Sequence, residues 1–138
     1  QFDAVTSTTG TTLTNVVGLT GFTVAAGGVY KFEIIINGVA TANSGHKIGL
    51  KLTTTTLTSA NYGAAAKLAS TCAFTQGTTA SDQMSLHAAT TATLGVFIRG
   101  RLVINAGGTI AVQAAQNAAH TDTTSVYVGS WATFTRVS

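Results

Sequence analysis

The side chains that could do acid–base or nucleophilic chemistry are few in this chain and stand far apart. The four carboxylates are Asp3, Glu33, Asp82 and Asp122. Hydrolytic catalysis needs a nucleophile, a base and a group that orients the base, and no segment brings these types together. We expect Glu33 to face solvent beside Lys31 on a strand, and Asp82 and Asp122 to lie in polar loops. The sequence therefore predicts a protein that is not an enzyme.

Metal and cofactor chemistry is represented just as sparsely. Of the histidines His46, His87 and His120, only His120 has another potential ligand close by, in His120-Thr121-Asp122. A metal site usually has three or four ligands, so we expect a solvated loop here. The alternative is that loops of identical subunits gather around a threefold axis. The single cysteine, Cys72, cannot form an internal disulfide and is predicted to be a small buried apolar side chain. We expect no cofactor and no metal.

Two arginines stand two residues apart, at positions 99 and 101. Because alternate residues of a strand point to the same side, they would present two planar guanidinium groups that could clamp a carboxylate on another subunit. The alternative is an ordinary solvated strand face. Apolar residues on the same side of the sheet indicate that part of this face is covered. The predicted subunit or partner interface comprises Ile35, Phe97, Arg99, Arg101 and Val103.

Three alternating segments predict the strands that would position these side chains, at residues 29–36, 46–52 and 94–104. The first buries four large residues, Tyr30, Phe32, Ile34 and Ile36. In the third, Gly100 interrupts the inward face, as a bulge or a close backbone approach would. Shorter strands are predicted at residues 13–17, 20–24, 73–76, 110–114, 125–128 and 131–137.

Glycines mark the predicted turns. Residues 25–28 (AAGG) precede a strand, and residues 105–108 (NAGG) are predicted to form a hairpin, both with positive φ angles. Residues 61–69 contain three consecutive alanines and are the one candidate for a helical turn. Many short strands separated by turns are typical of a β-sandwich, so the predicted fold is an all-β jelly-roll sandwich of about eight antiparallel strands.

Composition limits the classes of partner. The 138 residues suit a single domain spanning 1–138, and only 8% of them are charged, where about 25% is usual. No apolar run reaches the roughly 18 residues of a membrane span. The net charge of +3 is spread without the basic runs of nucleic-acid binders, so we expect no nucleic acid and no membrane as partner. Interface cores are depleted of charge, and the shortage of charge predicts a homo-oligomer.

Several stretches resemble segments that recur in structural proteins of tailed bacteriophages. The first is GLTGFTV at 18–24, which leads into AGGVYKFE at 26–33. The others are IRGRLVI at 98–104, AGGTIAVQAAQN at 106–117, VGSWA at 128–132 and TRV at 135–137. Together they cover most of the chain. One departure is the absence of proline. Related segments often carry a Gly-Pro after the second strong strand, and this chain has four threonines at 53–56 in that place.

The resemblance is to jelly-roll domains similar to the tumour-necrosis-factor and complement-C1q type, found in phage virion proteins and often trimeric. It implies a capsid decoration or cement protein that stabilises the outer shell, with the major capsid protein as partner and Arg99 and Arg101 clamping adjacent capsid subunits. The alternative is the trimeric knob of a tail fibre or spike that binds a host receptor. Decoration is favoured because no heptads or shaft repeats precede Phe2. A non-viral trimeric adhesion or lectin-like domain is a third interpretation.

The beginning of the chain carries one further expectation. It lacks the basic start and apolar stretch of a secretory signal, and it has no initiator methionine. We expect either a trimmed mature chain or a portion of a longer polypeptide.

Overall fold

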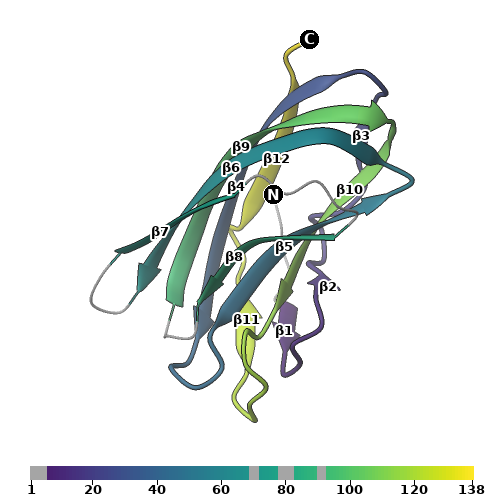
Figure 1. Ribbon diagram of the computed structural model, residues 1–138. Coiled ribbons are helices and arrows are strands. Elements are labelled where there is room, and N and C mark those ends of the chain that lie inside the picture. Colours follow the sequence, from purple (N-terminus) through teal and green to yellow (C-terminus); the bar gives the residue numbers. More distant parts are fainter. Residues whose placement is uncertain (1–5, 69–71, 78–82, 90–92) are drawn as a thin grey trace.

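The computed structural model describes residues 6–68, 72–77, 83–89 and 93–138, which form strands and turns without a helix (Figure 1). These residues contain twelve strands, more than the eight or so expected. Their bounds are β1 (Thr6–Thr8), β2 (Thr14–Asn15), β3 (Phe22–Val24), β4 (Val29–Ala40), β5 (His46–Thr53), β6 (Thr56–Leu68), β7 (Cys72–Gly77), β8 (Gln83–Ala89), β9 (Thr93–Ala106), β10 (Gly108–Ala115), β11 (Thr124–Val126) and β12 (Trp131–Arg136).

The strands form two antiparallel sheets that pack face to face. The large sheet has seven strands in the order β1-β11-β4-β9-β6-β7, with β12 also paired to β4. The small sheet has five strands in the order β2-β10-β5-β8, with β3 also paired to β10. The chain crosses between the sheets at the β1–β2, β3–β4, β4–β5, β5–β6, β7–β8, β8–β9, β9–β10 and β10–β11 connections. The all-β sandwich expected from the sequence is confirmed.

The core lies between the sheets and follows the alternation of the sequence. In β4 the side chains of Tyr30, Phe32, Ile34 and Ile36 are buried, whereas Lys31 and Glu33 are exposed. The inward side chains of β9 meet those of β5 and β10 to form one apolar cluster. Burying each large aliphatic side chain contributes roughly 2 kcal/mol, so this alternation both selects the strand conformation and stabilises the sandwich.

The helical turn expected at residues 61–69 is wrong, because residues 61–68 belong to β6. This strand pairs along its length with β9 and, from Tyr62 onward, with β7. Ala60, Ala64 and Ala66 point into the core, and Asn61 and Lys67 point outward. The period of two was therefore present but hidden, since alanine differs little from its neighbours in polarity. Pairing with β9 overrides the helix propensity of the alanines.

The hairpin expected at residues 105–108 is also wrong, since β9 and β10 lie in different sheets and do not pair. Neither Gly107 nor Gly108 has a positive φ. Gly107 is instead needed for close packing, because a Cβ there would lie 2.8 Å from the carbonyl oxygen of Val24. The turn at residues 25–28 is as expected, with Gly27 at φ 69°. Gly100 marks a close approach rather than a bulge, because an added Cβ would lie 2.7 Å from the Phe32 ring.

Besides β6, two further described strands were not expected, β1 and β8. In β8 the alternation of Met84 and Leu86 is interrupted by His87, which is buried as well. The side chains of Cys72 and Leu94, and the residues Asp3 and Asp82, lie outside the described part of the structure. Within that part, no helix is long and apolar enough to cross a membrane.

Candidate functional site

The solvent side of the large sheet carries most of the residues that the sequence singled out. We call this surface, across β12, β4, β9 and β6, the outer face. The strand registers place its side chains in rows that run across the sheet. All five predicted interface residues lie on it, three of them exposed or nearly so and two half-buried. The rows differ sharply in chemistry.

One row is apolar. Ile35 of β4 lies opposite Trp131 of β12 on one side and opposite Phe97 of β9 on the other. Ala65 of β6 continues the row beyond Phe97. The Phe97 side chain is 36% exposed, and the other three are half-buried. Trp131 is half-buried and lies on the outer face instead of in the core.

The next two rows are charged. Glu33 lies opposite Arg99, and Lys31 lies opposite Arg101. All four side chains are exposed, and none of them makes an ion pair or a hydrogen bond with a described residue. Like charges that face each other across strands are destabilising by a few tenths of a kcal/mol, up to about 1 kcal/mol. The pairing of Lys31 with Arg101 is therefore a local cost in the isolated chain.

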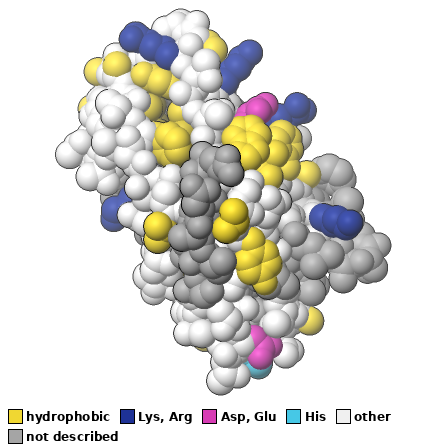
Figure 2. All heavy atoms as spheres, turned by 180° about the vertical axis from the view of Figure 1, so that it is seen from behind, with side chains coloured by type: hydrophobic (Ala, Val, Ile, Leu, Met, Phe, Trp, Pro, Cys, Tyr) yellow, Lys and Arg dark blue, Asp and Glu magenta, His cyan; other side chains and the backbone are white. Residues whose placement is uncertain are grey.

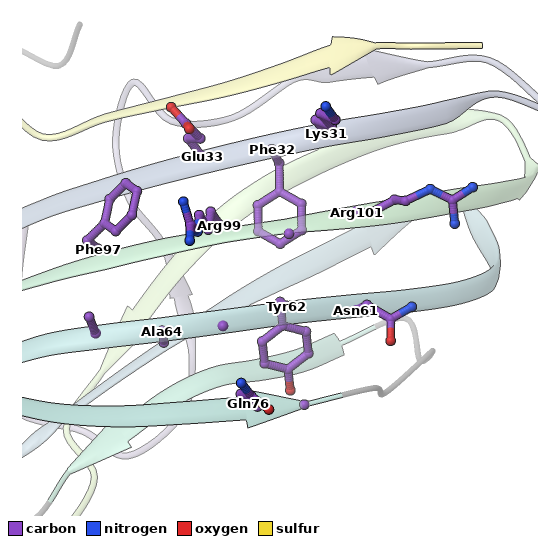
Figure 3. A pocket seen from close by; sticks show the side chains of 14 residues that line it. Lys31, Phe32, Glu33, Asn61, Tyr62, Ala64, Gln76, Phe97, Arg99 and Arg101 are labelled. Atoms are coloured by element: carbon purple, nitrogen blue, oxygen red, sulfur yellow. The ribbon is translucent and has the colours of Figure 1, made fainter.

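A broad groove of about 1020 Å³ lies over these rows (Figure 3). Arg99, Arg101 and Phe97 project from β9, while Gln76 of β7 lies on the opposite side of the groove. Gly63 and Ala65 of β6 lie between these two strands in the register. Gly63 has no side chain and that of Ala65 is small, so space is left above them. The groove thus has a cationic wall on β9, a polar amide on β7, and a floor on β6 that is low at Gly63 and Ala65 and carries Asn61 opposite Arg101.

A second, smaller hollow of about 320 Å³ adjoins the apolar row. Most of its lining is apolar, including Ile35, Phe97 and Ala65, but Asn37 and Lys67 also border it, and Gly95 contributes no side chain. Figure 2 shows the neighbouring chemistries on the side of the molecule seen from behind, where apolar side chains border an acidic side chain and several Lys and Arg side chains. The outer face therefore combines an apolar hollow with a cationic groove. Val103 lies in a separate row beyond Arg101, opposite Val29.

Comparison with known proteins finds no match for this chain. No family model, no curated protein and no solved structure matches this chain. The chemistry of its own surfaces must therefore carry the functional argument.

A polar cluster at one end of the sandwich accounts for His120 and Asp122. The Thr41 hydroxyl donates to Asp122 Oδ2 at 2.8 Å, and His120 Nδ1 lies 3.2 Å from the same oxygen. The hydrogen bond from Thr41 lowers the pKa of the Asp122 carboxyl below its usual value, and the charge of His120 adds to the effect. The cluster ties the β4–β5 turn to the β10–β11 loop, at the lower end in Figure 1. The loop expected from the sequence is present, and its acidic residue anchors it.

A second titratable pair was not assigned any role by the sequence. His46 of β5 and His87 of β8 are buried, with 0% and 2% of their surfaces exposed. None of their four ring nitrogens has a hydrogen-bond partner among the described residues. Burial, and to a lesser extent the charge of His87, lower the pKa of His46 to about 4. Burial also lowers the pKa of His87, so both imidazoles are neutral at pH 7.

The signal for this pair was present in the sequence but weak. His46 stands two residues before Ile48, on the inward side of an alternating strand. Sequence alternation therefore indicates burial for His46, but it shows nothing about its neighbour on β8. Among the described residues, no group of three or more His, Cys, Asp and Glu side chains is close enough to hold a metal ion.

Proposed function

We propose that this chain is a non-catalytic structural protein that docks onto a larger assembly through the outer face of its large sheet. The observation that carries the proposal is the arrangement of Lys31, Arg99 and Arg101 beside the apolar row of Ile35 and Phe97. The like charges of Lys31 and Arg101 face each other across two strands, which is slightly destabilising, and the partly exposed Phe97 ring leaves apolar surface in water. A partner that covers them relieves both costs. Arginine and aromatic residues are also enriched at protein interfaces.

The assembly we propose is a phage virion, and the place is the capsid exterior. The chain would act as a decoration or cement protein that binds the major capsid protein and stabilises the outer shell. The resemblance of the segments at 18–33, 98–117 and 128–137 to phage structural proteins supports this proposal, as does the all-β sandwich. We propose a homo-oligomer, with a trimer favoured by the same resemblance. The low content of charged residues, 8%, supports extensive subunit contacts.

The number of copies per virion tests this proposal. Particles of the phage that encodes the chain are purified, and the chain is quantified by gel densitometry against the major capsid protein. We expect about one copy per capsid subunit, or a fixed and sizeable fraction of that. A handful of trimers per particle would contradict decoration and would assign the chain to a tail-fibre knob. Complete absence from the particles would overturn the viral proposal.

A further inference from the structure

The chemistry of the outer face also specifies what its partner must carry, and this step rests on the docking role proposed above. We infer that the face binds an extended acidic segment of a different protein, with one apolar side chain followed at alternate positions by two carboxylates. Three features of the described residues carry the inference: the spacing along β9, the excess of positive charge, and the hollow beside Phe97.

The spacing along β9 matches an extended chain. Phe97, Arg99 and Arg101 are alternate residues of one strand, so their Cα atoms are separated by steps of roughly 7 Å. An extended partner segment has the same repeat between side chains that point to one side. The groove follows β9, and Gly63 and Ala65 leave room above β6 for a second backbone. A segment laid there can present an apolar residue and two carboxylates in register with these three side chains.

The excess of positive charge on this face determines which charge the partner must carry. Three cations on the charged rows face a single carboxylate, Glu33. A second copy of this chain placed against the same face would bring these cations together, whereas a carboxylate-bearing segment would neutralise them. Glu33 lies opposite Arg99, while Lys31 lies opposite Arg101. The strongest position for a partner carboxylate is therefore between Arg101 and Lys31, where two positive charges converge and no acidic side chain of the chain itself competes.

The apolar position is set by the smaller hollow. It is bordered by Ile35 and Phe97, and Gly95 contributes no side chain to it. A Leu-sized side chain that enters it covers the exposed part of Phe97, and burying that apolar surface adds affinity. Because the hollow precedes Arg99 along β9, the order of the three partner side chains is fixed relative to the strand.

The test uses two fluorescein-labelled peptides of identical composition. One is Gly-Leu-Thr-Glu-Thr-Glu-Gly, which carries the alternating pattern, and the other is Gly-Leu-Glu-Glu-Thr-Thr-Gly, which does not. Fluorescence anisotropy at low ionic strength measures binding to the full chain. We expect the alternating peptide to bind more tightly than the permuted one. Arg101→Ala should weaken it tenfold or more, because a charge-assisted hydrogen bond is lost, and Arg99→Ala should weaken it less.

The matched control is Lys51→Ala, which removes an exposed cation from β5 of the small sheet. It should leave peptide binding unchanged. Arg101→Lys keeps the charge but loses the guanidinium fork, and it should fall between the wild type and Arg101→Ala. Circular dichroism melts confirm that each variant is folded. Equal binding of the two peptides, or an equal loss in the Lys51→Ala variant, would overturn the inference.

Two further measurements separate this inference from the docking role. The wild-type chain and the Arg99→Ala, Arg101→Ala double variant are sedimented with purified particles, and their masses in solution are measured by light scattering. Particle binding that the double variant loses, without peptide binding by the wild type, would refute the acidic segment and leave docking through the outer face intact. A lower mass of the double variant would show that a second copy occupies the face, and the inference would be wrong.

Discussion

At the scale of single residues, the imidazoles of His46 and His87 stand out because they are buried polar groups without hydrogen-bond partners in the part of the chain that the structure describes. Unsatisfied buried polar atoms are rare in folded proteins, since each loses its hydrogen bonds to water without replacement. His87 lies opposite Ile48 on β5, so the two histidines are diagonal neighbours on adjacent strands. The inward side chains that surround them on β4, β9 and β10 carry no carboxylate or ammonium group. Among the described inward side chains, none can therefore stabilise a charge on either ring.

The first prediction is that the fold is labile in acid. The pKa of His46 is about 4 in the folded chain and about 6.5 when unfolded, so the unfolded chain binds more protons between these values. Stability is therefore complete above pH 6.5 and falls as the pH decreases toward 4. The loss amounts to about 3 kcal/mol from His46, and His87 adds to it in the same direction. Urea unfolding at a series of pH values measures it.

A pair of variants identifies the source of this pH dependence. His46→Leu removes the titrating group while keeping a side chain of similar size, and it should flatten the slope between pH 4 and 6.5. Thr53→Ala changes an exposed side chain of the same strand that does not titrate, and it should leave the slope unchanged. An equal slope in the wild type and in His46→Leu would contradict the prediction.

At the scale of elements, the polar cluster around Asp122 holds two connections together that would otherwise be independent. Thr41 and Asn43 both donate to Asp122 Oδ2 from the β4–β5 turn. Within the β10–β11 loop, the Gln116 amide donates to the backbone carbonyl of Asp122. The carboxylate therefore acts as a bridge between segments about 80 residues apart in the chain.

The second prediction concerns that bridge. Asp122→Ala removes the shared acceptor, and it should speed amide hydrogen exchange at residues 41–45 and 116–123 while leaving β4 and β9 unchanged. Hydrogen exchange followed by mass spectrometry measures the effect. Thr123→Ala, at the neighbouring exposed position, serves as the control and should exchange like the wild type. Unchanged exchange at both segments in Asp122→Ala would show that the bridge contributes nothing to loop order.

Comparison of the strands shows which parts of the fold could be predicted from the sequence. Strands with large inward side chains, such as β4 and β9, were predictable because apolar and polar residues alternate strictly. The same alternation placed Arg99 and Arg101 on one side. It could not show that Lys31 faces Arg101 or that Glu33 faces Arg99, because register depends on which strands pair. β6 was missed because alanine makes a weak pattern, and β8 because His87 breaks its pattern.

At the scale of the whole molecule, the topology brings together segments that are distant in sequence. β1 pairs with β11, and β4 with β9. Non-local pairing slows folding, because loop closure costs entropy before the contacts form. The chain contains no proline, so slow prolyl isomerisation cannot add a phase of tens of seconds.

The third prediction follows for the refolding kinetics. Refolding from urea should take milliseconds to seconds, and added prolyl isomerase should not change it. Stopped-flow fluorescence of Trp131, the single tryptophan, reports the return of the large sheet. Refolding that is complete within microseconds would contradict the role of non-local pairing. Phases that depend on protein concentration would report assembly of subunits rather than folding of one chain.

Gly63, on the floor of the groove, is a position where a substitution can block binding without affecting the core. Gly63 lies between Arg99 and Gln76 in the register, and its φ is not positive. A side chain added there would extend into the groove, on the side of the sheet away from Phe32 and the core. Gly63→Gln would thus act as a steric plug, and Gly63→Cys would accept a spectroscopic label at the centre of the docking surface. Substitutions at this one position can therefore either block binding to the outer face or report that a partner is bound there.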